Sequence, residues 1–314
     1  MSPTFLPRLD IDPNQYLGGV GVWGALPAIF DTTRFPVEHG VHVHARRAPG
    51  RKKDFDGSYG EVHIALPGGS AVITEASATP YVAAAVLGVP VREISCPYCS
   101  EQHLDTDRFA VHAHQRHLCV FCGCEFLEAE RSVGNPIVIT KRALNDASQI
   151  RPTTPGLPGP LRIDQTNPAL SGGVLIWGSN PAILWTASRD ESEGIHVHAF
   201  QAGVAEPVVD ETYQLVEIDG ICLDAKMVRI FMVQQSLPYL SGAVLAVPCP
   251  RCNAPHFDDA IPFAVTPHRN HRCTDCLHDF ATSAPVVANP LADVLERLYE
   301  NAGVAGTGKN PLAR

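Results

Sequence analysis

The sequence predicts an α+β protein dominated by β-structure, built as a tandem duplication of a small β-rich domain. Three observations support this prediction. One sequence pattern occurs twice at a nearly constant offset, the repeated segments alternate as strands do, and eight of the ten cysteines form two matching sets. Two like copies in one chain also lead us to expect a pseudo-twofold arrangement.

The repeat extends over most of the chain. An offset of 154 residues relates Trp23 to Trp177, and the run GVHVHA at Gly40 to GIHVHA at Gly194. The offset falls to 153 only around the first cysteine pair of each copy. A register held over about 120 residues indicates duplication of a whole domain, because solenoid repeats have much shorter periods.

The composition places the domain boundaries. We expect copy one at residues 15–145, a Pro-rich linker at 146–168, copy two at 169–302 and a flexible tail at 303–314. Frequent prolines favour an extended, semi-rigid linker, and a Gly-rich polar terminus rarely packs.

In chain order, each copy begins with three short strands, which alternate or are uniformly apolar and end at turn residues. The expected pairs are Val20–Trp23 with Val174–Trp177, Val41–Ala45 with Ile195–Ala199, and Val62–Leu66 with Gln214–Ile218.

One amphipathic helix follows in each copy. In copy two the apolar face recurs every three or four residues, at Met227, Ile230, Phe231, Gln234 and Leu237. Residues Tyr81–Leu87 are its weaker counterpart in copy one. A further strand then leads to the first cysteine pair.

The cysteines are spaced as metal ligands. Each copy has two CxxC pairs, separated by nineteen residues in copy one and twenty in copy two. Two such turns present four thiolates to one Zn²⁺. The expected ligands are Cys96, Cys99, Cys119, Cys122, Cys249, Cys252, Cys273 and Cys276.

This pattern, with a CPxC first turn, resembles the zinc-ribbon class. The resemblance covers 96–126 and 249–280, and it implies two short hairpins around a structural Zn²⁺ in each copy. Disulfides, a redox-active CxxC and an iron site are the alternatives. Cys124 and Cys222 have no counterpart in the other copy and are expected to fill small apolar spaces.

Histidine is the second signal, with fourteen residues, ten of which pair between the copies. The paired candidates, with two nearby acids, are His42, His44, His103, Asp105, His114, His196, His198, His256, Asp258 and His268. His117 and His271 precede a cysteine ligand by two residues and are expected to support the zinc site by donating hydrogen bonds to its thiolates or to backbone carbonyls.

Three interpretations of these histidines stay open. They can support the zinc sites through hydrogen bonds, they can bind an additional metal, or they can work with Asp as a metal-free general acid and base. Both imidazoles of an HxH strand lie on one face, opposite the valines. We therefore expect the HxH histidines to line a functional surface, with His103, His114, His256 and His268 as neighbours.

Charge narrows the class of partner. The chain carries 33 acidic and 24 basic residues, a net charge of −9, which argues against non-specific binding to nucleic-acid backbones. One basic run, unmatched in copy two, is a candidate contact for a phosphate or an acidic partner: Arg46, Arg47, Arg51, Lys52 and Lys53. No apolar stretch reaches the ~20 residues of a membrane helix, and we expect a cytoplasmic location.

Two main functions fit these features. The first is a zinc-binding module or scaffold that contacts a protein or small-molecule partner through its histidine-lined surface. The second is a metal-dependent hydrolase or related enzyme that uses the repeated His and Asp residues. A nucleic-acid reader is a third option, and the sequence does not identify a substrate or partner.

Overall fold

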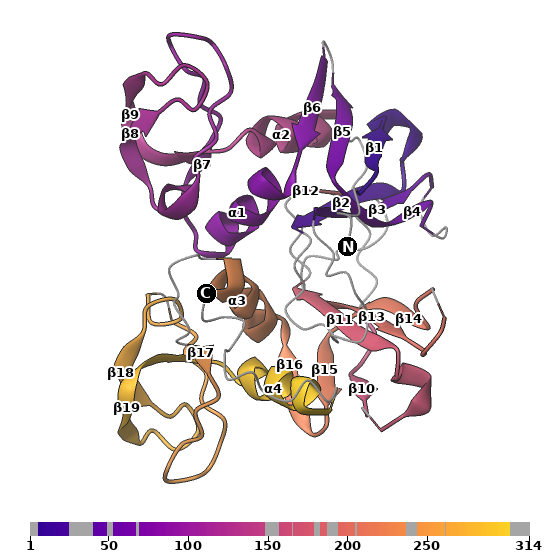
Figure 1. Cartoon of the computed structure of the whole chain (residues 1–314), viewed down its shortest axis with the longest axis vertical. Helices are drawn as coiled ribbons and strands as arrows, with labels where there is room; N and C mark the ends of the chain where they lie inside the picture. The colour runs from indigo at the N-terminus through magenta and orange to yellow at the C-terminus, as the bar shows by residue number, and fades with distance from the viewer. Residues whose placement is uncertain are drawn as a thin grey trace. The chain divides into compact units, whose positions relative to one another are not determined.

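The computed structural model describes residues 6–24, 40–48, 53–66, 69–147, 157–164, 166–178, 183–186, 194–204, 206–236, 244–260 and 262–301. These residues form two compact units, and β-strands dominate both, as predicted (Figure 1). None of the helices within these ranges combines the length and apolar character needed to cross a membrane.

The first unit begins with an antiparallel sheet of order β12-β2-β3-β4. Its strands are β2 (Gly19–Gly24), β3 (Val41–Arg46), β4 (Phe55–Tyr59) and β12 (Ile183–Thr186). β3 is a central strand, and Val41 through Ala45 are all buried. Its two faces are therefore both shielded from water.

A second sheet of the first unit has the order β1-β5-β6, in which β1 runs parallel to β5. It contains β1 (Arg8–Ile11), β5 (Glu61–Leu66) and β6 (Gly69–Ile73). The helices α1 (Glu75–Val86) and α2 (Ile137–Ala147) pack against the sheets of this unit. Val22, Val43, Ile64, Ile73 and Ile137 belong to the apolar core that results.

The third sheet of the first unit has the cysteine ligands of copy one in the segments between its strands. It has the order β7-β9-β8, with β7 (Val91–Arg92), β8 (His114–Leu118) and β9 (Glu125–Gly134). β8 and β9 form an antiparallel hairpin, as the zinc-ribbon resemblance implied. Figure 1 shows this hairpin well separated from β3 within the unit.

The second unit contains the same kinds of sheet in the same order along the chain. Its sheets have the orders β11-β13-β14, β10-β15-β16 and β17-β19-β18. The strands are β10 (Leu161–Ile163), β11 (Gly173–Gly178), β13 (Ile195–Phe200), β14 (Val209–Tyr213), β15 (Leu215–Ile218), β16 (Ile221–Asp224), β17 (Val244–Leu245), β18 (His268–Arg272) and β19 (Asp279–Ala288), and the helices are α3 (Ala225–Ser236) and α4 (Leu291–Asn301).

The expected strands and the expected helix of copy two are present, but each copy has a second helix that the sequence analysis missed. α2 and α4 follow the repeated Asn-Pro dipeptide, and the Asn side chain accepts a hydrogen bond from the first helical amide. The Oδ1 atoms of Asn135 and Asn289 lie 3.0 and 3.1 Å from the amide nitrogens of Ile137 and Leu291. An Asn cap followed by Pro is a helix-start signal, so these helices were readable in the sequence.

The copy boundaries also need correction. β1 lies before the expected start of copy one at 15, and β10 lies before the expected start of copy two at 169. In both units this first strand pairs in parallel with a later strand, which makes it part of the domain. Within the linker, residues 148–156 lie outside the described residues, as does the expected tail at 303–314.

β12 is the one strand whose sequence position does not match its unit. Residues Ile183–Thr186 fall within the sequence of copy two, yet the strand pairs with β2 and belongs to the first unit. Backbone hydrogen bonds do not depend on side-chain identity, so the sequence does not specify through them which strand pairs with which. The repeat pattern therefore gave no indication of this pairing.

Candidate metal centres

The eight expected cysteine ligands form two four-cysteine groups. In the first group the Sγ atoms of Cys96 and Cys122 are 3.7 Å apart, and those of Cys99 and Cys119 are 3.6 Å apart. The second group, formed by Cys249, Cys252, Cys273 and Cys276, repeats both distances. Zn–S bonds of about 2.3 Å in a tetrahedron place sulfurs roughly 3.8 Å apart. Both groups therefore have the geometry of a metal site, and none of these cysteines is in a disulfide.

Tight backbone turns aim these thiols at one point. The amide nitrogens of Ser100 and Gly123 donate to the carbonyl oxygens of Cys96 and Cys119, each at 2.8 Å. Ser100 and Gly123 have φ values of 62° and 71°, in the left-handed region. That region favours glycine, so Gly123 adopts this conformation after the second CxxC pair without strain.

The thiols of one group do not ionise equally. Burial opposes ionisation of Cys96, but hydrogen bonds from the backbone of Tyr98 and Cys99 outweigh it and lower its pKa to about 7. The equivalent Cys249 has its pKa lowered to about 6. In contrast, the backbone hydrogen bond at Ala254 opposes a rise in the pKa of Cys252, but burial and the neighbouring thiols outweigh it and raise the pKa to about 12. Four thiolates this close repel one another, so a dication is the natural partner of the full set.

The two remaining cysteines are not members of either four-cysteine group. Cys124 is half-buried and Cys222 is exposed. The expectation that they fill apolar spaces is therefore wrong for Cys222.

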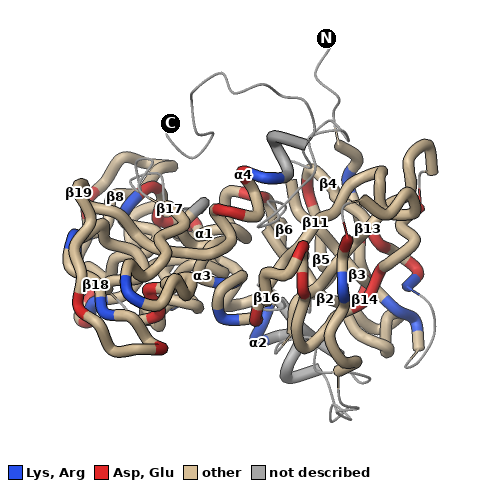
Figure 2. The backbone as a smooth tube through the Cα atoms, turned by 90° about the horizontal axis from the view of Figure 1, so that it is seen from below, with Lys and Arg blue, Asp and Glu red and all other residues tan. Residues whose placement is uncertain are grey.

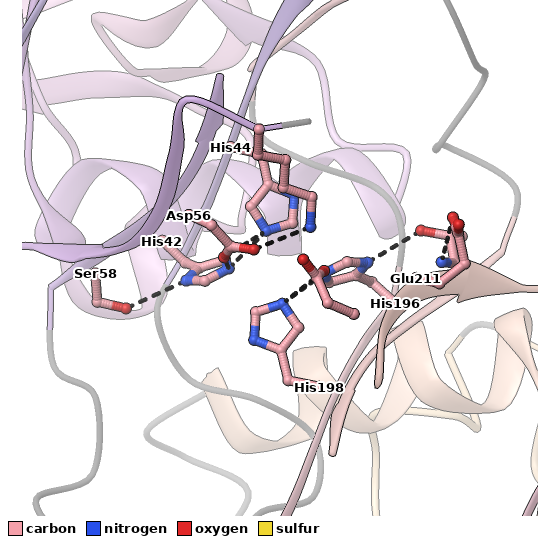
Figure 3. A network of polar contacts seen from close by, with 10 residues as sticks. His42, His44, Asp56, Ser58, His196, His198 and Glu211 are labelled. Carbon is pink, nitrogen blue, oxygen red and sulfur yellow. Dashed lines mark hydrogen bonds and ion pairs between the residues drawn. The ribbon is translucent and has the colours of Figure 1, made fainter. Parts of the chain in front are cut away.

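The HxH strand of the first unit forms a second kind of cluster (Figure 3). The Nε2 atoms of His42 and His44 are 2.9 Å apart, and Asp56 Oδ1 lies 3.6 and 3.2 Å from them. Strand register explains the arrangement, because Asp56 on β4 is directly opposite His44 on β3. Ser58, opposite His42, lies 3.3 Å from its Nδ1. Ligand bonds of about 2.0–2.1 Å at angles between about 90° and 110° would separate two nitrogens by roughly 2.9–3.4 Å.

The second unit repeats this cluster with its own residues. The Nε2 atoms of His196 and His198 are again 2.9 Å apart, and Asp210 Oδ1 lies 3.6 and 3.3 Å from them. Asp210 is opposite His198, and Thr212 takes the place of the serine beside His196. Asp56 and Asp210 were not among the candidate residues, although their repeated position in both copies marked them.

The HxH histidines do not line a surface, contrary to expectation. His42 and His44 are each 1% exposed, and His196 and His198 are 2% and 5% exposed. The strand alternation is correct, but both faces of the central strands β3 and β13 are covered. Trp23 lies over the histidine face of β3, with its ring centroid 4.7 Å from that of His44.

The histidines of each ribbon form a third kind of cluster, around an aspartate. In the first unit, His103 Nε2 donates to Asp105 Oδ1 at 2.7 Å, and His114 Nε2 lies 3.3 Å from the same oxygen. His117 Nδ1 lies 3.3 Å from Asp105 Oδ2. Burial opposes ionisation of Asp105, but hydrogen bonds from His103 and from the Gly134 amide lower its pKa below the usual value. Burial lowers the pKa of His117.

The same arrangement surrounds Asp258 in the second unit, with His256, His268 and His271. These residues also line a cavity of about 640 Å³. Two expectations are corrected here. His117 and His271 contact the aspartates, and among the described residues neither contacts a cysteine thiol. The ribbon histidines likewise gather around their own aspartates and not beside the HxH strands (Figure 1).

Two described residues of the basic run, Arg47 and Lys53, pair with carboxylates. Arg47 Nε lies 3.6 Å from Asp54 Oδ1, and Lys53 Nζ lies 3.1 Å from Asp56 Oδ2. Arg51 and Lys52 lie outside the described residues. Figure 2 shows acidic and basic residues interspersed along the tube. An anion contact at this run stays a prediction.

The cysteine groups and the histidine clusters could thus hold metal ions. We compared the chain with protein-family models, with curated proteins and with solved structures, and no match was found in any of the three comparisons. Side-chain geometry is therefore the basis on which function can be proposed.

Proposed function

We propose that this chain is a tandemly duplicated zinc protein that acts as a binding module for a protein partner. Each four-cysteine group holds one Zn²⁺ as a structural ion, because four thiolates leave no open coordination position. An intracellular location is part of the proposal, since eight thiols must stay reduced to bind metal. A pseudo-twofold arrangement of the copies stays a prediction from the repeat.

The observation that carries this proposal is an exposed apolar tip on the first ribbon. Tyr98, Val120 and Phe121 lie inside the two CxxC turns and are 66%, 62% and 63% exposed. The turns are adjacent, because their cysteines converge on one point. Leu118 and Leu127, on the hairpin strands, are also exposed. Aromatic side chains gathered on a surface are typical of protein–protein interfaces.

The four-cysteine geometry does not require this apolar tip, because the second ribbon has the same geometry without it. At the positions of Tyr98, Val120 and Phe121 the second ribbon carries Arg251, Thr274 and Asp275, all exposed. The two ribbons have the same cysteine geometry, so the apolar residues serve something other than the metal. A partner with a complementary apolar surface would remove them from water, at about 25 cal/mol per Å² of buried apolar area.

The two ribbons supply the test. The triple variant Tyr98→Arg, Val120→Thr, Phe121→Asp gives the first tip the residues of the second. We expect two zinc ions per chain and an unchanged thermal midpoint, because the second ribbon folds with these residues. A photo-reactive amino acid at position 121 should cross-link a defined protein in cells, and the purified partner should bind the triple variant at least tenfold more weakly.

The matched control is a photo-reactive residue at Thr274, at the polar tip. Equal cross-linking from the two tips would contradict the proposal. So would an unchanged affinity of the purified partner for the triple variant.

A second candidate function, a metal-dependent hydrolase, is favoured by the HxH clusters. Each brings two imidazole nitrogens and a carboxylate oxygen of one unit within 3.6 Å of one another. Two histidines and a carboxylate are a ligand set of catalytic zinc and of non-haem iron. Zn²⁺- or Mn²⁺-dependent cleavage of chromogenic ester or phosphoester substrates, abolished in Asp56→Asn with Asp210→Asn, would support it. Hydrolysis that persists in this double variant would exclude these clusters. No contact among the described residues favours the nucleic-acid reader.

A further inference from the structure

The aspartate of the second ribbon has an unusual number of nitrogen neighbours. Asp258 Oδ1 lies 2.8 Å from His256 Nε2, 3.4 Å from His268 Nε2 and 3.4 Å from His271 Nδ1. Its other oxygen, Oδ2, accepts the amide N–H of Ala288 at 2.7 Å. Each imidazole has one lone pair in its neutral form, so the position of its proton decides whether it attracts the carboxylate.

Neutral His268 carries its proton on Nδ1, and its other ring nitrogen, Nε2, faces Asp258. Its Nδ1 atom lies 3.0 Å from the carbonyl oxygen of Thr266. A carbonyl oxygen only accepts hydrogen bonds, so Nδ1 must carry the hydrogen. The Nε2 atom of neutral His268 therefore presents a lone pair to Asp258 Oδ1.

His271 has a suitable acceptor beside each of its ring nitrogens. Its Nε2 atom lies 3.4 Å from Thr282 Oγ1, and the Thr282 hydroxyl donates to the carbonyl oxygen of Ala284 at 2.8 Å, so Oγ1 can accept from Nε2–H. In the other neutral tautomer Nδ1 carries the proton and donates to Asp258 Oδ1 at 3.4 Å. When the proton is on Nε2, the Nδ1 lone pair of His271 faces the same carboxylate oxygen as His268.

With the His271 proton on Nε2, three acceptors converge on one buried point, which is repulsive unless a cation lies among them. We propose that Asp258, His268 and His271 bind a divalent cation, separate from the zinc of the ribbon, and that His256 positions the carboxylate by donating to it. Ligand bonds of about 2.0–2.2 Å in a tetrahedron separate ligand atoms by roughly 3.3–3.5 Å. Both His–Asp distances of 3.4 Å agree with that value, whereas the 2.8 Å contact of His256 is a hydrogen-bond length.

The metal would be reachable from outside. The three ligands line the cavity of about 640 Å³, together with Phe263 and Arg272. Three protein ligands are the number found in catalytic zinc sites, where a water or a ligand takes the fourth position. The chemistry of this site thus fits a small anion, such as phosphate or a carboxylate, bound to the metal near a guanidinium group.

The first ribbon repeats the essential geometry. His114 Nδ1 lies 2.8 Å from the carbonyl oxygen of His112, so its Nε2 lone pair faces Asp105 Oδ1 at 3.3 Å. His117 Nδ1 lies 3.3 Å from Asp105 Oδ2. Two ribbons with different surface residues thus place the same histidines around one aspartate, but among the described residues His117 Nε2 has no counterpart of the Thr282 contact of His271.

Native mass spectrometry of the Co²⁺-loaded full chain tests the proposal. We expect Asp258→Asn to bind one metal ion fewer than the wild type. His256→Ala should weaken the binding of that ion by about 10–100-fold, which is the usual effect of removing a group that orients a ligand. Asn270→Ala, which changes a residue lining the same cavity, is the control and should keep the wild-type metal count. The thiolate-to-Co²⁺ absorption of the ribbons should be the same in every variant.

Two further measurements use the wild-type chain, so the test does not depend on the folding of a variant. Inorganic phosphate should shift the Co²⁺ ligand-field bands while leaving the thiolate absorption unchanged. Nitrogen-15 spectra of the histidines should show His268 Nε2 moving on metal addition. A metal count that is equal in Asp258→Asn and wild type would overturn the proposal. So would spectra in which His268 carries a proton on both nitrogens and does not change when metal is added. The imidazolium of His268 would then supply the positive charge beside Asp258.

Discussion

Replacing His44 with alanine should strongly destabilise the first unit. The side chain is 1% exposed, its Nε2 atom lies 2.9 Å from His42 Nε2 and 3.2 Å from Asp56 Oδ1, and its ring packs on Trp23. Alanine removes all of these contacts. It leaves a cavity beside the indole and deprives the buried His42 of a partner.

The magnitude follows from these two losses. An orphaned buried polar group costs about 1–3 kcal/mol. An imidazole ring leaves a cavity of about 60 Å³, which adds about 1.5 kcal/mol at ~24 cal/mol per Å³. The sum is roughly 2.5–4.5 kcal/mol, a large part of the 5–15 kcal/mol by which domains are typically stable. For a unit of this size that corresponds to a fall in Tm of roughly 5–18 °C.

Thermal unfolding followed by circular dichroism measures the effect, and tryptophan fluorescence reports on the site itself because Trp23 touches the ring. The matched control is His112→Ala. His112 also belongs to the first unit, but it is an exposed residue. Surface changes of this kind are usually within about 0.5 kcal/mol. A fall in Tm of less than about 2 °C for His44→Ala would refute the argument from burial. It would instead support the prediction that the HxH histidines line a solvent-facing surface.

Three further outcomes are expected. Cys99→Ser should lower the zinc content by one ion per chain and reduce solubility, whereas Cys124→Ser should change neither; metal analysis that shows equal zinc in both variants would contradict the four-cysteine site. The pKa of Asp105 is lowered, since hydrogen bonds outweigh burial, so its contribution to stability is complete above the unfolded pKa of about 4 and is lost as the pH falls below it. Urea midpoints measured from pH 6 to pH 2 should therefore fall less steeply for Asp105→Asn than for the wild type. Leu184→Pro should disturb β12 and speed hydrogen exchange in β2; unchanged exchange there would exclude the pairing.

Several features were readable from residues alone. The eight cysteine ligands could be named because the CxxC spacing is set by the local geometry of one turn. The HxH strands and the face of α3 were likewise predictable, because periodicity reports which residues share a face. The caps of α2 and α4 were present in the sequence as Asn-Pro and were overlooked.

Other features depended on contacts between distant segments. The alternation of β3 shows that His42 and His44 share a face, but tertiary neighbours such as Trp23 determine that this face is buried. Asp56 became part of the cluster through strand register, and β12 joined the sheet of the first unit through backbone hydrogen bonds. The direction of the His268 proton likewise follows from a carbonyl oxygen whose position no side-chain pattern records. Local spacing determined the ligands of each ribbon, whereas burial, register and proton positions were decided by tertiary packing, because each depends on groups that the chain brings together only when it folds.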